Sequence, residues 1–139
     1  MKTLDSEDKL AVHELLSMAA YAYDERDVAM LESCFAIQAS FSMRIGGGDL
    51  VGPFQGREAI MGLMNGSMAE QTDVRRHVVS NIFFDPRQAE PTVVSNLTLF
   101  ATEKGEIQLL SAGVYRDTVV FEDAAWRILN RHIELDKPY

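Results

Sequence analysis

The chain has 139 residues, of which 47% are hydrophobic and 24% charged, and its formal net charge is −8 at pH 7. This length and composition predict one globular domain, over residues 1–139, that is large enough to bury a core. The basic residues are few and scattered, so the chain does not fit the proteins that bind nucleic acid through phosphate contacts. No stretch reaches the ~20 apolar residues of a membrane helix, which excludes a helical membrane protein.

The cysteine content and the N-terminal sequence bear on the cellular compartment. Cys34 is the single cysteine, so no disulfide can form within the chain and no thiolate metal site is expected. It falls in an apolar helical stretch, which favours a buried structural thiol over a nucleophile. The polar sequence MKTLDSEDKL does not have the pattern of a signal peptide. We therefore expect a cytoplasmic protein.

Two helices and a strand are predicted in the first third of the chain. Ser6 is a suitable N-cap for a helix over 7–24, in which apolar residues recur at helical spacing. Asp27 is a suitable cap for a second, short helix over 28–35. The alternating residues of 39–45 then predict a strand.

The rest of the chain changes from helical to strand periodicity. After a turn at Gly52-Pro53, Gly56 introduces a third helix with an apolar inner face. Four strands joined by short turns follow, at 74–84, 92–102, 106–121 and 125–135. Helices first and an antiparallel meander later predict an α+β fold. We expect a curved antiparallel sheet that forms a cone around the three helices and leaves an apolar small-molecule pocket at its open end.

The stretch YAYDERD, residues 21–27, places a carboxylate near the end of the first predicted helix. Asp24 falls at the edge of the apolar stripe, where partial burial would disfavour its charged form and make it a better base. The other interpretation is that Asp24 belongs to a solvated turn with the charged residues that follow. This stretch alone favours the solvated turn.

A histidine lies in the first strand of the meander. Alternation in RRHVVSN puts His77 on the same face as Arg75 and Asn81. An imidazole that faces the cone can act as a general acid or base, and Asn81 would orient it or bind substrate. The alternative is a core histidine satisfied by one hydrogen bond. His13, on the first helix, is expected at the surface or at an interface.

The last strand, WRILNRHIELD, carries an arginine. Strict alternation puts Arg131 and His132 on opposite faces, and one of these faces lines the cone. An inward Arg131 would bind an anionic or polarised group of a substrate. The alternative is an ion pair with a local acid such as Glu134 or Asp136.

Metal and cofactor motifs are not found in the sequence. The three histidines are far apart and show no HxH or HExxH spacing. The turn at Gly46–Gly48 lacks the lysine and the hydroxyl residue of a P-loop. We therefore expect neither a cofactor nor a metal.

Several segments, taken in order, resemble a known family. These are YAYDERDVAMLESCF, FQGREAIMGLM, RRHVVSNIFFD and SAGVYRDTVVFEDAAWRILNRHIELD, and they are similar to the SnoaL-like branch of the nuclear-transport-factor-2-like superfamily. The resemblance covers nearly the whole chain. It is more specific for the fold than for function, because this fold hosts many activities.

Two enzymes of the superfamily suggest a catalytic pair. Scytalone dehydratase carries a Tyr-Asp pair at the end of its first helix and a His in the first strand of its meander, which match Tyr23-Asp24 and His77. Hexachlorocyclohexane dehydrochlorinase uses an Asp-His pair at these places and an Arg in its last strand, which matches Arg131. The resemblance implies that His77 removes a proton from carbon, with Asp24 orienting it. It also implies that Arg131 holds the leaving group or a developing negative charge.

Other positions depart from scytalone dehydratase. Its second catalytic His has no counterpart in SNLTLFA, and its substrate-binding Tyr and Asn fall near Met43 and Gly113. The resemblance therefore implies elimination or isomerisation of a more apolar cyclic or aromatic molecule than scytalone. We expect the substrate pocket to be lined by Tyr23, Phe41, Phe54, Met64, Asn81, Tyr115 and Arg131.

The small subunit of aromatic-ring-hydroxylating dioxygenases is a competing relative, because RRHVVSN and WRILNRHIELDKP are similar to its strands. That subunit is structural and packs against a catalytic, iron-bearing partner. In that case Asp24 and His77 would be fold remnants or interface residues. A third interpretation is a small-ligand-binding protein of the same fold. Resemblance to the two enzymes also implies a homo-oligomer, either a trimer or a dimer.

Overall fold

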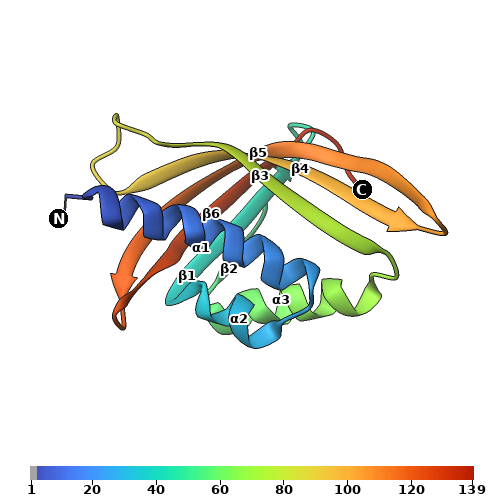
Figure 1. Ribbon diagram of the computed structural model, residues 1–139, viewed down its shortest axis with the longest axis horizontal. Coiled ribbons are helices and arrows are strands. Elements are labelled where there is room, and N and C mark those ends of the chain that lie inside the picture. Colours follow the sequence, from blue (N-terminus) through green and yellow to red (C-terminus); the bar gives the residue numbers. More distant parts are fainter. Residues whose placement is uncertain (1–2) are drawn as a thin grey trace.

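The computed structural model describes residues 3–139 (Figure 1). Its elements are α1 (Ser6–Asp24), α2 (Val28–Ser33), β1 (Phe35–Ile45), β2 (Val51–Gln55), α3 (Arg57–Glu70), β3 (Val74–Phe84), β4 (Thr92–Glu103), β5 (Glu106–Glu122) and β6 (Ala125–Leu135). The predicted α+β class is confirmed, because a curved, unclosed six-stranded sheet covers the three helices. No helix within the described residues is long and apolar enough to cross a membrane.

The strand order of the sheet is β2-β1-β6-β5-β4-β3. The meander from β3 to β6 is antiparallel, as predicted, whereas β1 runs parallel to β6. α1 packs against β3 at one edge of the sheet, and α3 packs against β1 near the other edge. The three helices therefore lie against the concave face of the sheet, where they face the strands of the meander.

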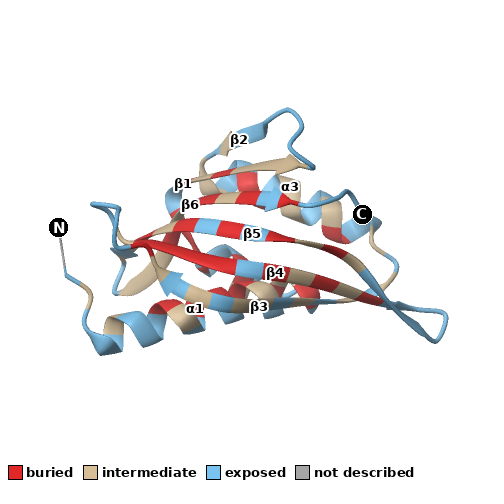
Figure 2. Ribbon diagram, turned by 90° about the horizontal axis from the view of Figure 1, so that it is seen from above, coloured by how far each residue is buried: buried red, intermediate tan, exposed pale blue. Residues whose placement is uncertain are grey.

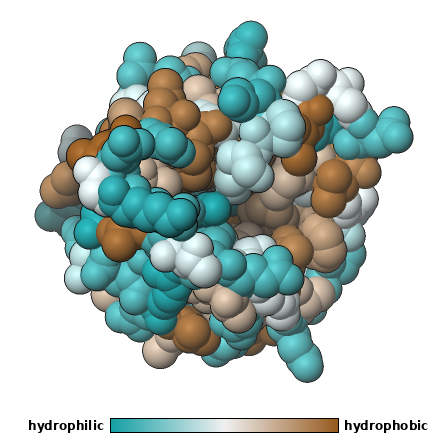
Figure 3. All heavy atoms as spheres, turned by 90° about the vertical axis from the view of Figure 1, so that its right-hand side faces the viewer, coloured by the Kyte–Doolittle hydropathy of each residue, from teal (hydrophilic) through white to brown (hydrophobic). Residues whose placement is uncertain are grey.

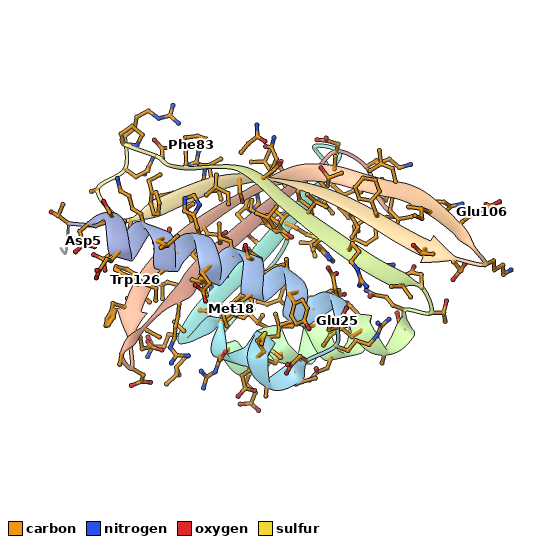
Figure 4. All side chains as sticks on the ribbon, in the orientation of Figure 1. Asp5, Met18, Glu25, Phe83, Glu106 and Trp126 are labelled. Carbon is orange, nitrogen blue, oxygen red and sulfur yellow. The ribbon has the colours of Figure 1, made fainter. Side chains whose placement is uncertain are left out.

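The core fills the space between the helices and the concave face. Fully buried side chains come from α1, β1, α3 and β6 and include Leu16, Phe35, Ile60 and Ile128. Figure 2 shows buried residues along the middle of β4, β5 and β6 and exposed residues at the β4–β5 hairpin tip. At the other end of the sheet, Trp126 lies beside the start of α1 and donates a 3.2 Å hydrogen bond to Asp8 (Figure 4).

The helix starts show one confirmed cap and one correction. Asp27 caps α2, as predicted, and its side chain accepts a 3.1 Å hydrogen bond from the backbone of Met30. α1 is capped by Asp5 and not by Ser6, which is already helical. The side chain of Asp5 accepts from the backbone of Asp8, whose carboxylate accepts in return from the backbone of Asp5, and this reciprocal pair fixes the start.

Two predicted boundaries differ in the segment between α2 and α3. β1 begins at Phe35, because the Cys34 carbonyl already accepts a 2.8 Å hydrogen bond from Ile128 and so joins the sheet. This shortens α2 relative to the predicted helix. Gly52-Pro53, predicted as a turn, lies with a cis peptide bond inside the short strand β2, which pairs with β1 through Val51, Phe54 and Gln55.

A bulge in β3 inverts the predicted alternation. The pairing of β3 with β4 shifts register between Ser80 and Phe83, and Asn81 adopts a positive φ of 56°. Ile82 and Phe84 consequently pack against the core, while Asn81 is exposed. The face predicted to continue from His77 to Asn81 therefore ends at the bulge.

A second bulge lies in β6. Asn130 pairs with β5 and so does Ile128, but Leu129 between them has no partner in the register. As a result Ile128 and Arg131 are both buried, although strict alternation puts them on opposite faces. Residues from both of the faces predicted for this strand are therefore buried in the core.

Gly113 on β5 is required by the close approach of β6. A Cβ atom there would lie 2.3 Å from the Glu134 carbonyl oxygen and 3.1 Å from the Leu135 Cα, and both are backbone atoms. This position has no room for the Asn of scytalone dehydratase. We expect Gly113→Ala to lower the free energy of unfolding by about 1–3 kcal/mol, the usual cost of overpacking, in urea titrations.

The matched control is Gly66→Ala on α3. An added Cβ at Gly66 meets no atom within 4 Å. Because alanine is the better helix former, this change should raise the free energy of unfolding by about 0.5–1 kcal/mol. Equal stability of the Gly66 and Gly113 variants would contradict the predicted clash.

Candidate active site

A cavity of about 110 Å³ lies between the helices and the concave face of the sheet. Five of the predicted residues line it, namely Tyr23, Phe41, Met64, Tyr115 and Arg131, and His77 lines it as well. An apolar cavity of roughly 150 Å³ holds benzene, so this volume suits a ligand of about one ring. Figure 3 shows a hollow on the end of the molecule that carries the C-terminus, with apolar side chains on its right side and hydrophilic side chains on its left.

Asp24 and His77 are in direct contact. Asp24 is the last residue of α1, and the residue that follows it, Glu25, is labelled in Figure 4. His77 lies on β3, against which α1 packs. The Nδ1 atom of His77 lies 2.5 Å from Oδ1 of Asp24, and the backbone N–H of His77 donates a 2.7 Å hydrogen bond to Oδ2. Their side chains are only 6% and 10% exposed. The solvated-turn interpretation of Asp24 is therefore wrong.

This contact favours one tautomer of His77. A carboxylate beside Nδ1 holds the proton there and leaves the lone pair on Nε2. Nε2 makes no hydrogen bond within residues 3–139, and His77 is a cavity wall whereas Asp24 is not. The imidazole thus stands between the carboxylate and the cavity. Such a pair can accept a proton at Nε2, with Asp24 stabilising the resulting cation.

Tyr23 forms the wall next to this pair. Its ring meets the His77 ring edge-on, with 5.2 Å between the centroids, and its hydroxyl lies 2.5 Å from Nε2 of Gln71. Burial raises the pKa of the Tyr23 phenol above its ordinary value, with the hydrogen bond to Gln71 acting in the opposite direction. Tyr23 therefore remains a neutral hydroxyl at neutral pH.

Arg131 is held by an acid on the neighbouring strand. Its Nε and Nη2 atoms donate hydrogen bonds of 2.7 and 2.9 Å to the two carboxylate oxygens of Asp117, which is fully buried. Burial acts to lower the pKa of Arg131, but the Asp117 carboxylate outweighs this effect and the net shift is upward. The guanidinium also lies 4.1 Å from the centroid of the Tyr115 ring. Its partner is thus neither Glu134 nor Asp136.

The sequence between residues 5 and 132 matches the family of the SnoaL-like domain. The chain belongs to this family. No match is found among curated proteins.

Solved structures similar to this SnoaL-like chain agree on the fold. A protein from Catenulispora acidiphila in complex with S-DNPA has a TM-score of 0.80 at 20% identity, covering 95% of this chain and 96% of its own. The beta subunit of benzoate 1,2-dioxygenase from Burkholderia mallei has a TM-score of 0.76 at 17% identity, and the match covers 97% of this chain and 93% of that subunit. A proposed scytalone dehydratase from Novosphingobium aromaticivorans has a TM-score of 0.73 at 21% identity, and the match covers 93% of this chain and 83% of that protein. At these identities the likeness shows the fold alone.

Two residues predicted to line the cavity of the SnoaL-like domain lie outside it. Asn81 is exposed at the β3 bulge, which turns it away from the concave face. Phe54 on β2 lies behind a wall residue, Phe41, with 6.5 Å between the ring centroids. These two predictions were wrong because the bulge and the extra strand β2 were not anticipated. His13, expected at the surface or at an interface, is half-buried beside Phe84.

Asp117 is the site residue that sequence reasoning missed. It alternates on β5 with Tyr115 and Val119, so the inward phase of this strand contains one carboxylate. This departure from an apolar pattern was the available signal. Ser67 and Tyr139 also line the cavity and carried no comparable signal. In the part of the chain that is described, no group of three or more His, Cys, Asp and Glu side chains could hold a metal ion.

Proposed function

We propose that this SnoaL-like protein is a cofactor-independent lyase or isomerase in which His77 removes a proton from carbon of a small, largely apolar cyclic or aromatic substrate. The observation that carries the proposal is the buried contact between His77 and Asp24 at the cavity wall. The resemblance to scytalone dehydratase and to the dehydrochlorinase supports it. The two side chains supply the proton transfer themselves, so no cofactor enters the proposal.

The proposed step moves one proton and one electron pair. The substrate C–H bond breaks, its proton binds Nε2 of His77, and its electron pair stays on the substrate. Asp24 stabilises the imidazolium through Nδ1. In an elimination the electron pair expels a leaving group from the neighbouring carbon. In an isomerisation the imidazolium returns the proton to a different carbon.

The cavity limits the substrate that can take part. Phe41, Leu97 and Ile133 are among its walls, and side chains of this kind bind apolar ligand surface. Its volume of about 110 Å³ favours a molecule near the size of a single ring. A polar group on that molecule would meet the hydroxyls and the imidazole at the wall.

The proposal is tested by hydrogen–deuterium exchange at carbon. The protein is incubated in D₂O with single-ring compounds that have acidic C–H bonds, such as cyclohexenone and acetophenone, and loss of the proton signal is followed by NMR. Reversible proton removal gives exchange whatever the later step is. We expect exchange above the buffer rate, and this excess should depend on the Asp24–His77 pair. Exchange that is the same with and without an intact pair would contradict the proposal.

Replacing Asp24 with asparagine should weaken exchange while the imidazole remains in place. The amide has no negative charge to stabilise the imidazolium, and its NH₂ group can donate to Nδ1, which moves the ring proton to Nε2. We expect the exchange rate to fall by at least about tenfold, but by less than loss of His77, because an orienting carboxylate contributes less than the base itself. Thermal melts of both proteins check that the variant is folded.

The alternative is a non-catalytic small subunit of a ring-hydroxylating dioxygenase, or a small-ligand-binding protein of the same fold. The fold likeness to the benzoate dioxygenase beta subunit favours the former. A chain without exchange activity that retains a larger oxygenase subunit in pull-downs would support it. Ring binding without exchange would support a ligand-binding protein.

We also propose a homo-oligomer, a dimer or a trimer. Apolar side chains on the outer face of the meander are exposed, among them Val78, Leu109 and Val114. Association would bury part of this face. Light scattering coupled to size-exclusion chromatography gives the mass directly, and a monomer at micromolar concentration would contradict association.

A further inference from the structure

We propose that the Tyr115 hydroxyl binds the carbonyl oxygen of the substrate, so that the proton removed by His77 is the one α to that carbonyl. This inference rests on the proposed function of His77 and narrows it to one substrate class, small cyclic or aryl ketones and related carbonyl compounds. It also assigns stabilisation of the developing negative charge to Tyr115, a role that the family resemblance gives to Arg131.

The Tyr115 hydroxyl is open to the cavity and has no hydrogen-bond partner among the described residues. Tyr115 is only 5% exposed and lines the cavity, yet its hydroxyl makes no hydrogen bond within residues 3–139. The fully enclosed side-chain atoms that lack a partner in the described part of the chain are Nη1 of Arg75 and Oγ of Ser95, so the Tyr115 hydroxyl is accessible and can donate a hydrogen bond to a ligand in the cavity. Burial raises the pKa of Tyr115 above its ordinary value. The phenol is therefore neutral at physiological pH and can donate its proton to an oxygen atom.

Tyr115 shares the cavity with the imidazole of the Asp24–His77 pair. Tyr115 and His77 are both walls of the same space of about 110 Å³, which one ring would fill. A ligand of one ring that donates a C–H to His77 therefore occupies the space that Tyr115 also lines.

Asp117 and Arg131 support Tyr115 from behind. Two nitrogens of Arg131 are held by Asp117, so its positive charge is compensated and its side chain is fixed. Its guanidinium stacks 4.1 Å from the Tyr115 ring centroid. Burial raises the pKa of Tyr115, the Arg131 charge acts in the opposite direction and the Asp117 charge raises the pKa again, so the net shift is upward and the phenol keeps its proton. Arg131 and Asp117 are thus positioning residues, and Tyr115 makes the contact.

The reaction balances without another reactant. Nε2 of His77 takes the α proton, the C–H electron pair forms a carbon–carbon double bond, and the carbonyl π pair moves onto oxygen. The resulting enolate oxygen accepts a hydrogen bond from Tyr115, which keeps its proton. Return of the proton to another carbon gives isomerisation, and departure of a β substituent gives elimination.

Binding of a single-ring oxyanion tests the assignment without turnover. The probe is 4-nitrophenol, whose anion carries its charge on an oxygen like that of an enolate and absorbs visible light. We expect saturable binding of the anion to the wild-type protein, with a shifted absorption band. Tyr115→Phe removes one oxygen atom and should weaken binding by about 10–100-fold, since a hydrogen bond to a charged acceptor is lost.

Tyr21→Phe is the matched control, because Tyr21 is 59% exposed on α1. This variant should bind the probe as the wild type does. Unchanged affinity in Tyr115→Phe, or no saturable binding to the wild type, would overturn the inference. Circular dichroism of both variants confirms that they are folded.

The outcomes for Tyr115 and for His77 are separable. Exchange that requires His77, together with probe binding that does not require Tyr115, would overturn this inference and leave the proposed function intact. Probe binding that requires Tyr115, together with exchange that does not require His77, would support the oxygen site and overturn the proposed base.

Discussion

Replacing His77 with alanine is expected to lower the rate of carbon–deuterium exchange by roughly 10²–10⁴-fold, the usual size of a general-base contribution. The polar walls of the cavity are otherwise tyrosine and serine hydroxyls and the Arg131 guanidinium. None of these is a base near neutral pH, and Asp24 lies behind the imidazole, outside the wall. Loss of the ring therefore removes the acceptor itself. Proton NMR in D₂O measures the rate for wild type and variant under the same conditions.

His132→Ala is the matched control for the loss of an imidazole. His132 lies on β6 beside Arg131, but its ring contacts Ser42 and Glu134 and is not part of the cavity wall. We expect the control to exchange substrate at the wild-type rate. An equal loss in the two variants would indicate that the effect arises from folding, and an unchanged rate in His77→Ala would show that His77 is not the base.

The strands of the meander could be predicted because local signals mark them. The predicted ranges 74–84 and 125–135 agree with β3 and β6, since alternating residues are bounded there by polar turns. The pairing of β1 with β6 has no such signal, because parallel neighbours distant in sequence are chosen by tertiary packing. β2 was missed for a related reason. It is short and mostly exposed, and it contains Gly52-Pro53, which read locally as a turn.

Inward and outward faces were predicted less well than the strands themselves. A one-residue bulge exchanges the faces of every residue beyond it, and nothing in the local pattern marks the bulge at Asn81 or at Leu129. These bulges accompany the curvature of the sheet around the helices. They explain why Asn81 is exposed and why Ile128 and Arg131 are both buried.

The Asp24–His77 contact came from resemblance and not from pattern. YAYDERD alone favoured a solvated turn, because the charged residues around Asp24 are typical of a helix end. Burial of Asp24 depends on α1 packing against β3, which is information about residues far apart in sequence. Asp117 had a local signal, a carboxylate in an inward phase, but charged residues are so rarely buried that this signal alone does not predict a buried carboxylate.

The second large effect is expected from Asp117→Ala. Arg131 remains positively charged at every accessible pH, because the Asp117 carboxylate raises its already high pKa even against the effect of burial. Removal of Asp117 thus leaves a buried charge without its partner, and we expect the free energy of unfolding to fall by about 3–5 kcal/mol. Urea titrations measure this loss. The same variant should also weaken probe binding, because the Arg131 side chain that supports Tyr115 is no longer fixed.

Replacing both partners distinguishes a lost charge pair from a lost shape. In Asp117→Val combined with Arg131→Met the buried charge is absent and most of the volume is kept, so we expect much of the stability to return. A double variant as unstable as Asp117→Ala would show that packing, and not the uncompensated charge, sets the cost. With stability restored, probe binding would report the effect of the Arg131 charge on Tyr115. Affinity equal to that of the wild type would mean that Tyr115 needs no cation behind its ring.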